Sequence, residues 1–319
     1  MCVFATLVVS AALTAAAATL PGGDRVTIAD GVEMPLINMG GVMASYSNGT
    51  YSSNHTLWLE LGGRGIDTAL MYSDAVQREV GAAVKWGVSA GIPREEIFVA
   101  TKVPCCPMTH NDSFTSWCEA NPDKWNAKAN VEHDFEMLGL EYVDLMLVHW
   151  ACSTMEDTVA TYKALQPLLK SGKAKAIGVS NFNATFLEAF LNEEEVMRHP
   201  PSINQCGYSI HGHGGNDPNT VTPLGRDTAT RDMCRKHNVT YSAYSPLGGL
   251  TGIKLWNNTQ VKAVAKVHGV SAAQVALRWV VQQGVPAVTA SNKPAYDKSD
   301  LDIFGFELTE AEMIKLSSI

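Results

Sequence analysis

The sequence predicts an α/β fold, a closed (β/α)8 TIM barrel with an N-terminal β-hairpin closing its bottom. Two observations support this fold class. Eight short β-rich runs recur along the chain, and seven of them follow a stretch with the amphipathic spacing of a helix. In addition, a barrel of this kind takes about 250 residues as one domain, and residues 25–319 contain no linker or low-complexity tract that would divide them.

The runs and the helices between them define the units of the predicted barrel. The β-rich runs are 34–42, 65–70, 97–104, 143–150, 174–181, 202–209, 240–247 and 286–291. Helical spacing covers 74–90, 156–171, 230–237, 271–283 and 309–316, with Ser271 at an N-cap position. Before the first run, Asp30-Gly31 lies between alternating apolar residues, which is typical of a hairpin. A doubly wound sheet is disfavoured, because Gly40-Gly41 stands where that fold carries a G-x-G-x-x-G fingerprint.

Composition and charge exclude several classes of protein. With 46% hydrophobic and only 18% charged residues, the chain is too apolar to be disordered. Its net charge of −8 argues against binding nucleic acid, which needs a basic face. After the N-terminus no apolar run is long enough to span a membrane, and nothing indicates a hydrophobic interface. We therefore expect a monomer whose mature chain has no membrane span.

The N-terminal segment predicts entry into the secretory pathway. Residues 1–20 carry no charged side chain, and their apolar core ends in Ala16-Ala17-Ala18, so residues 1–18 are interpreted as a signal peptide. A cytoplasmic location is the alternative, because the segment lacks the usual positively charged start. Six N-x-S/T acceptors favour a glycoprotein of the secretory pathway or the extracellular space: Asn48, Asn54, Asn111, Asn183, Asn238 and Asn257.

The number of cysteines is compatible with disulfide bonds. Without the leader, six remain, namely Cys105, Cys106, Cys118, Cys152, Cys206 and Cys234. Cys118 lies a short loop away from Cys105 and Cys106, so a bridge from Cys118 to one of these two is the favoured disulfide. Free buried cysteines are the alternative.

Chemistry-bearing side chains gather where the predicted strands end, which is where barrels carry their active sites. Asp67, Lys102 and His149 come from runs two, three and four, and Tyr72 follows Asp67 closely. A tyrosine is a poor acid because its ordinary pKa is about 10, and a neighbouring ammonium is expected to lower that pKa. We expect Lys102 to do so, Asp67 to orient Lys102, and His149 to orient a carbonyl. Taken singly, Asp67 and Lys102 could form a structural ion pair, Tyr72 could be a surface aromatic and His149 a core histidine. Their convergence on one mouth favours catalysis.

From about Arg25 to its end, the chain resembles the aldo-keto reductase superfamily. The motifs that carry the resemblance are GIDTALMY (65–72), TKVP (101–104), LGLEYVDLMLVHW (138–150), IGVSNF (177–182), NQ (204–205) and AYSPLG (243–248). The resemblance implies an oxidoreductase that reduces an aldehyde or ketone by hydride transfer from NADPH or NADH, an activity of the alcohol dehydrogenase [NADP+] type. It also implies Tyr72 as the general acid, Asp67 and Lys102 as its tuning pair, and His149 as the residue that orients the carbonyl.

The resemblance further implies the residues that bind the nicotinamide cofactor. Ser180, Asn181 and Gln205 would bind the carboxamide, and Tyr244 would stack on the ring. Ser245 and Leu247 would bind the pyrophosphate, in keeping with the phosphate sites of barrels at their last loops. Ser291 matches the family pattern at the adenosine end.

Departures from the family pattern concern the adenosine end and the substrate pocket. Ala290, Tyr296 and Asp300 stand where the family has Lys, Arg and Asn, which leaves the 2′-phosphate of NADPH without its cations and suggests that Asp300 contacts the ribose of NADH. The expected substrate contacts are Val42, Trp150 and Trp117, the last within an expanded loop over 105–125. His211 and His213 have no third ligand at a recognisable spacing, so no metal site is predicted.

Two other functions are compatible with a barrel fold, a cofactor-binding module and a hydrolase. A cofactor-binding regulatory or sensing module with little turnover is the alternative, because a fold alone does not fix function. A barrel hydrolase is disfavoured, since no second acidic residue ends a strand next to Asp67.

Overall fold

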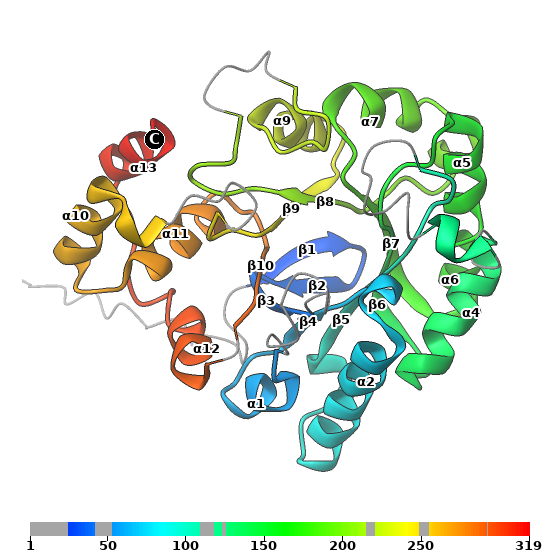
Figure 1. Cartoon of the computed structure of the whole chain (residues 1–319), viewed down its shortest axis with the longest axis horizontal. Helices are drawn as coiled ribbons and strands as arrows, with labels where there is room; N and C mark the ends of the chain where they lie inside the picture. Colours follow the sequence, from blue (N-terminus) through cyan, green and yellow to red (C-terminus); the bar gives the residue numbers. More distant parts are fainter. Residues whose placement is uncertain are drawn as a thin grey trace, which may run out of the picture.

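The computed structural model describes residues 25–41, 53–108, 118–122, 126–214, 221–248, 255–291 and 293–319. Eight parallel strands form a closed barrel in the order β10-β3-β4-β5-β6-β7-β8-β9, which confirms the predicted fold class. Figure 1 shows helices arranged around this ring of strands. The strands are β3 (Ile37–Gly40), β4 (Gly65–Asp67), β5 (Phe98–Val103), β6 (Val143–Val148), β7 (Ala174–Ser180), β8 (Ile203–Gly207), β9 (Thr240–Tyr244) and β10 (Ala287–Thr289).

Each predicted β-rich run contains one barrel strand. The first run also takes in the end of a hairpin strand, because β2 (Val32–Pro35) pairs antiparallel with β1 (Arg25–Ala29). The turn between them has Gly31 at φ +68°, a conformation that glycine adopts without strain.

The predicted hairpin closes the bottom of the barrel. Ile28, Val32 and Met34 of the hairpin pack in one buried cluster with apolar side chains from β5 to β8, such as Phe98 and Leu145. In Figure 1 the hairpin lies at the centre of the ring of strands. The expected site residues, at the carboxyl ends of the strands, lie at the other mouth.

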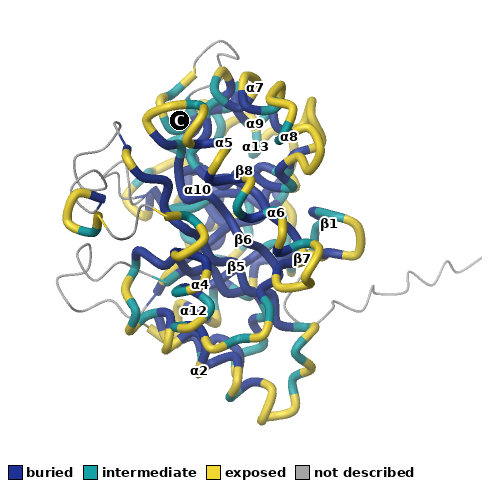
Figure 2. The backbone as a smooth tube through the Cα atoms, turned by 90° about the vertical axis from the view of Figure 1, so that its right-hand side faces the viewer, coloured by how far each residue is buried: buried dark blue, intermediate teal, exposed yellow. Residues whose placement is uncertain are grey.

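The helices cover the outside of the barrel and leave their outer faces exposed (Figure 2). They are α1 (His55–Glu60), α2 (Asp74–Ser89), α4 (Ala127–Leu138), α5 (Met155–Lys163), α6 (Gln166–Ser171), α7 (Ala184–Leu191), α8 (Glu194–Met197), α9 (Thr228–Lys236), α10 (Thr259–His268), α11 (Ala272–Val281), α12 (Pro294–Leu301) and α13 (Glu310–Ser317), with the 3-10 turns η2 (Leu70–Tyr72), η3 (Arg94–Glu96) and η5 (Leu255–Asn257).

Most predicted helices are confirmed within a residue or two, but one is wrong. Ser271 caps α11 through a capping box with Gln274, as the N-cap position predicts. The single helix expected over 156–171 is two helices, α5 and α6, that meet at Ala164 and Leu165. Pro167 lies in the first turn of α6, where its missing N–H costs no hydrogen bond, whereas inside one continuous helix it would break the ladder.

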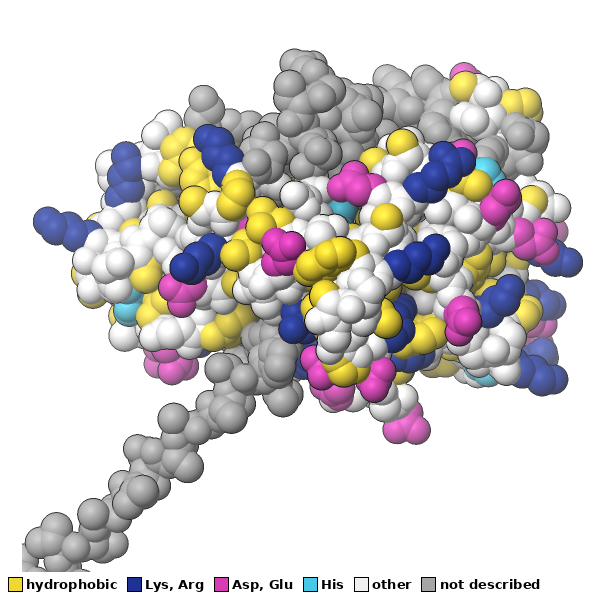
Figure 3. Space-filling view, turned by 90° about the horizontal axis from the view of Figure 1, so that it is seen from below, with side chains coloured by type: hydrophobic (Ala, Val, Ile, Leu, Met, Phe, Trp, Pro, Cys, Tyr) yellow, Lys and Arg dark blue, Asp and Glu magenta, His cyan; other side chains and the backbone are white. Residues whose placement is uncertain are grey.

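Two features of the described structure concern a membrane or a charged molecule as a partner. None of the described helices is both long and apolar enough to cross a bilayer. On the face in Figure 3, the acidic and basic side chains of the described residues are interspersed rather than gathered by sign.

Candidate active site

Asp67 and Lys102 form a buried ion pair at the open mouth of the barrel. Asp67 ends β4 and Lys102 lies on the neighbouring strand β5, with side chains 3% and 1% exposed. The Lys102 ammonium lies 2.5 Å from Oδ1 of Asp67 and also donates to the carbonyl oxygen of Thr68 at 3.0 Å. The second carboxylate oxygen accepts a hydrogen bond of 2.8 Å from Nε2 of Gln205. Both side chains thus have polar partners where water is excluded, as a buried ion pair requires.

Tyr72 lies beside this pair, at the end of η2. The Lys102 ammonium is 5.6 Å from the centre of its ring, and the ring meets that of His149 edge-on at 6.0 Å. Burial first, and the negative charge of Asp67 second, raise the pKa of Tyr72 above its ordinary value. The expected lowering of this pKa by Lys102 is therefore wrong in direction, since burial outweighs an ammonium already bound to Asp67. Tyr72 remains a protonated donor at neutral pH.

His149 follows β6 and lies in the same mouth. Its backbone N–H donates to the carbonyl of Val103 at 2.9 Å, which extends the pairing of β5 and β6 to the catalytic positions. Burial first, and the charge of Lys102 second, lower the pKa of His149 well below its ordinary value. The imidazole is therefore neutral at pH 7 and has one N–H to donate. Trp150, an expected substrate contact, is buried and packs on the His149 ring at a centroid distance of 4.2 Å.

The expected carboxamide-binding residues lie in an arc of hydrogen bonds across β7, β8 and β9. Asn181 donates through Nδ2 to the carbonyl of His149 at 3.0 Å and to Oγ of Ser180 at 3.1 Å. The Ser180 hydroxyl in turn donates to the carbonyl of Gln205 at 2.6 Å. Because Gln205 also contacts Asp67, this arc joins the expected cofactor site to the buried ion pair. Asn181 has φ +64°, a left-handed conformation that Asn tolerates better than most residues.

Tyr244 closes the arc at the end of β9. Its hydroxyl donates to Oδ1 of Asn181 at 2.7 Å. Burial raises the pKa of Tyr244 to about 12, so the ring is an uncharged stacking surface. Ser245, the next residue, has φ +53°, and Leu247 packs partly buried against the main core.

Arg226 is a contact of this arc that sequence reasoning missed. It precedes α9, and its Nη2 donates to the Tyr244 hydroxyl at 3.2 Å. The available signal was Gly207, two residues after Gln205 on β8. A glycine at a strand position that faces the mouth leaves space for a side chain from another segment of the chain.

The adenosine end lies after β10 and differs from the expectation at one residue. Ala290 is exposed, and Ser291 is buried with its hydroxyl accepting from the Lys293 N–H at 2.9 Å. Tyr296 is 56% exposed, with the Lys293 ammonium 5.0 Å from its ring centre. Asp300 is buried instead, and its carboxylate accepts from the Thr289 hydroxyl at 2.8 Å. Its role as a ribose contact is not supported, because its side chain stabilises the joint between β10 and α12.

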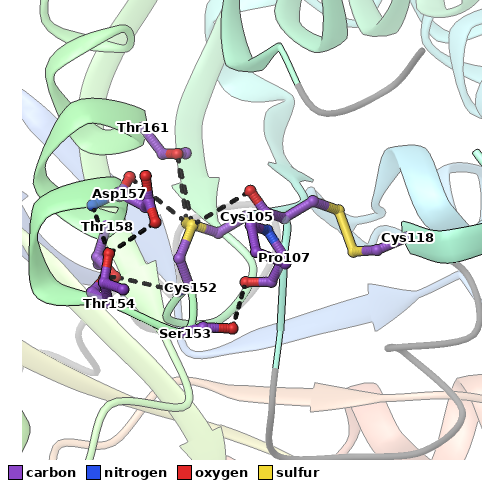
Figure 4. The surroundings of a disulfide bond; sticks show 10 residues. Cys105, Pro107, Cys118, Cys152, Ser153, Thr154, Asp157, Thr158 and Thr161 are labelled. Carbon is purple, nitrogen blue, oxygen red and sulfur yellow. Dashed lines mark hydrogen bonds between the residues drawn. A yellow bond between two sulfur atoms is a disulfide. The ribbon is translucent and has the colours of Figure 1, made fainter. Parts of the chain in front are cut away.

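Two disulfides lie beside the catalytic strand ends (Figure 4). Cys106 pairs with Cys118, which confirms the favoured bridge and chooses between its two candidates. Cys105 pairs with Cys152, a bond that the sequence did not reveal. The spacing could have indicated this pairing, because Cys105 follows Lys102 and Cys152 follows His149 by the same three residues. Ser153 strengthens this link, because its N–H and its hydroxyl both donate to the carbonyl of Pro107, at 2.9 and 3.0 Å.

A second network that the sequence did not predict lies behind the barrel wall. Gln77 of α2 hydrogen-bonds both to Thr68, next to Asp67, and to the buried carboxylate of Asp134 on α4. Asp134 also accepts from the Thr101 hydroxyl at 2.9 Å, one residue before Lys102. The outward-facing neighbours of Asp67 and Lys102 are therefore linked to the same carboxylate, Thr101 directly and Thr68 through Gln77.

Some expected sites lie outside the described residues. These are the signal peptide over 1–18, the substrate contacts Val42 and Trp117, and the acceptors Asn48 and Asn111. Of the described acceptors, Asn54, Asn238 and Asn257 are exposed. His213 is buried, with its ring nitrogens 3.2 and 3.1 Å from the carbonyls of Ser209 and Ser317, which fits a structural role.

The residues at the mouth fit a reduced nicotinamide cofactor. Asn181 and Gln205 offer amide groups for a carboxamide, Tyr244 offers a neutral ring, and Arg226 adds a cation for a ligand that bears phosphates.

Comparison with known proteins gives one family. The family model "Aldo/keto reductase family" matches residues 54–319. A 9,11-endoperoxide prostaglandin H2 reductase of Trypanosoma cruzi is 33% identical over 92% of this chain and 90% of its own length. A glyoxal reductase of Bacillus subtilis is 32% identical over 93% of this chain and 92% of its own. Among solved structures, an aldo-keto reductase enzyme from a Medee basin deep-sea metagenome library superposes with a TM-score of 0.74 at 30% identity, over 92% of this chain and 94% of that one.

Proposed function

Because the chain belongs to the aldo/keto reductase family, we propose that it reduces aldehydes or ketones to alcohols with a reduced nicotinamide cofactor. The observation that carries the proposal is the convergence at one mouth of a protonated Tyr72, a neutral His149 and a compensated Asp67–Lys102 pair. The placement of these groups separates them from a purely structural ion pair, because all four side chains meet where the strands of a barrel end.

The proposed roles follow from the state of each group. When bound, the cofactor would supply the hydride. Tyr72 and the His149 N–H would donate hydrogen bonds to the carbonyl oxygen, where negative charge develops. Tyr72 would then transfer its proton to that oxygen, and the nearby Lys102 ammonium would stabilise the phenolate left behind. The Asp67 carboxylate would keep Lys102 charged and in place.

The proposed cofactor is NADPH, with NADH as the alternative. Ser180, Asn181, Gln205 and Tyr244 support a nicotinamide ring at the mouth, with Ser245, Leu247 and Ser291 along the rest of the dinucleotide. The exposed Ala290 offers no charge to a 2′-phosphate, whereas Lys293 beside Tyr296 offers one nearby. Affinity for both cofactors therefore has to be measured.

The test is turnover of purified protein with each cofactor against a panel of aldehydes and ketones, followed by nicotinamide absorbance. Carbonyl-dependent oxidation of either cofactor would support the proposal. Tight cofactor binding without turnover on any carbonyl would contradict it and favour a regulatory or sensing module on the same fold.

We also propose that the protein matures in the secretory pathway. Its two disulfides support this, because such bonds persist in oxidising compartments. The exposed acceptors Asn54, Asn238 and Asn257 are accessible for N-glycans. Expression in cultured eukaryotic cells, followed by glycosidase treatment, should give a downward shift on a gel. A protein that stays in the cytosol and shows no shift would contradict the proposal.

A further inference from the structure

Arg226 occupies a position over the mouth of the barrel that β8 leaves open. Gln205 and Gly207 lie on the same face of β8, because strand residues two apart point to the same side. A Cβ atom at Gly207 would lie only 3.1 Å from Cδ and Nε of Arg226. The Arg226 side chain therefore fills the space one step above Gln205, at the rim of the expected cofactor site.

The guanidinium of Arg226 makes a single hydrogen bond within the described residues, the one to the Tyr244 hydroxyl. Its Nε is buried and has no hydrogen-bond partner there. No carboxylate of the described part lies within ion-pair distance. The adjacent Asp227 is committed elsewhere, since its oxygens accept from Thr222 and from the N–H of Thr230.

Three other partly buried arginines of the described part have acidic partners, whereas Arg25 and Arg278 donate to neutral oxygens. Arg94 contacts Asp144 at 3.2 Å, Arg64 contacts Glu96 at 3.7 Å, and Arg231 contacts Asp232 at 3.6 Å. Pairing is the usual state of a charge removed from water. Arg226 differs from them in lying at the mouth without an acidic partner, and with a buried Nε that has no hydrogen-bond partner among the described residues.

We propose that Arg226 binds an oxyanion of the ligand, either a phosphate of the dinucleotide or the carboxylate of an acidic carbonyl substrate. The inference rests on the proposed function and extends it to a residue and a charge. A guanidinium has five N–H donors in a planar fork that matches phosphate and carboxylate oxygens. The Asp67–Lys102 pair is internally compensated, so Arg226 brings an uncompensated positive charge to this rim.

Occupation of this oxyanion site would be transmitted to the catalytic residues. Arg226 donates to Tyr244, Tyr244 to Asn181, and Asn181 to the carbonyl of His149. A ligand oxyanion on Arg226 would thus fix the first member of a continuous chain of hydrogen bonds that ends at the residue expected to orient the carbonyl.

The experiment compares Arg226→Met and Arg226→Lys with a matched control, Arg235→Met. Arg235 lies on α9, the helix that Arg226 precedes, and its side chain is 78% exposed. Inorganic pyrophosphate and succinate are tested as probes by calorimetry on each protein, and the Kd of NADPH is measured by fluorescence. We expect Arg226→Met to weaken at least one probe by about ten- to a hundredfold, as loss of a charged hydrogen bond does. Arg226→Lys should recover part of the loss, and the control should match the wild type.

The same variants distinguish a phosphate of the dinucleotide from a substrate carboxylate as the source of the oxyanion. If the phosphate is the ligand, Arg226→Met raises the Kd of NADPH and leaves unchanged the ratio of kcat/KM for succinic semialdehyde over butyraldehyde. If a substrate carboxylate is the ligand, that ratio falls because the KM for succinic semialdehyde rises, and the Kd of NADPH stays the same. Either outcome supports the inference. Unchanged probes, Kd and ratio in folded Arg226 variants would overturn it.

Failure of this inference and failure of the proposed function are distinguishable. Binding of pyrophosphate or succinate that depends on Arg226 requires no turnover, so it would stand even if no carbonyl were reduced. Conversely, the enzyme could be active while its Arg226 variants bind every ligand like the wild type. In that case the proposed function stands and the oxyanion site at Arg226 is rejected. If Arg226→Met does not fold, Arg226→Lys and Arg226→Gln give the same comparison with smaller changes in volume.

Discussion

The two halves of the barrel mouth are held together in different ways. On the side of β4, β5 and β6, the catalytic candidates are fixed by a buried ion pair, two disulfides and a carboxylate behind the wall. On the side of β7 to β10, the expected cofactor contacts Ser180, Asn181 and Tyr244 are joined to one another by hydrogen bonds between neutral groups, and the adenosine end is exposed at Ala290 and Tyr296.

The difference separates two demands on a reductase. Groups that move a proton need fixed positions, because small misplacements reduce rates strongly. A cofactor that must be released after each turnover is served by contacts of modest strength on an open rim. Changes in the first half should therefore act on kcat, and changes in the second half on cofactor affinity.

The largest effect is expected from Tyr72→Phe. Removing the proton donor should lower kcat by about 10²- to 10⁴-fold, the usual contribution of a general acid. Cofactor affinity should stay near that of the wild type, since Tyr72 lies in the catalytic half. Turnover and fluorescence titration measure the two quantities. Wild-type kcat in this variant would show that another group donates the proton.

The disulfides provide a matched pair of variants for the catalytic half. Replacing Cys105 and Cys152 by Ala should lower kcat roughly tenfold, because the bond holds the segments that carry Lys102 and His149. Replacing Cys106 and Cys118 should affect KM for the carbonyl instead, because that bridge lies within the loop after β5. Both pairs should lower the melting temperature, so only the split between kcat and KM tests the idea. Equal kcat in the two double variants would contradict it.

A change in the cofactor half should leave kcat alone. Ala290→Lys places a cation at the exposed position after β10, where a 2′-phosphate would gain a charge-assisted hydrogen bond. The Kd of NADPH should fall by about tenfold relative to that of NADH. The two constants are measured by fluorescence quenching, with Lys298→Met as the control. An unchanged ratio would mean that residue 290 does not face the 2′-phosphate.

How far the sequence predicts this molecule depends on the range of each interaction. Alternating β-rich runs and caps such as Ser271 are local patterns, so all eight strands and most helices could be predicted. Catalytic positions at strand ends were also predictable, because a barrel brings those ends together. Arg226 could not be found this way, since it reaches its place from a loop about twenty residues after Gln205. The pKa of Tyr72 was missed for a related reason: burial depends on packing that no motif records.

An effect on stability rather than on activity is expected at the carboxylate behind the catalytic half. Burial raises the pKa of Asp134 from its ordinary 3.8 to about 7, although hydrogen bonds from Thr101 and Gln77 oppose the shift, as do the charges of His133 and Lys102. Between these two values the folded protein keeps a proton that the unfolded chain has released. The free energy of unfolding should therefore fall as the pH rises through this window, by at most about 1.4 kcal/mol per pH unit.

Asp134→Asn removes this titration while keeping a side chain of the same shape. Relative to the wild type, the variant should gain stability between about pH 4 and pH 7 and show a constant difference above that window. Urea unfolding at several pH values measures the difference, with Asp30→Asn in the exposed hairpin turn as the control. A difference that does not change with pH would show that Asp134 titrates at the same pH in the folded and unfolded states. The carboxylate would then hold Thr101 and Gln77 in its ionised form throughout, and the catalytic half would carry one more buried charge than this view assigns to it.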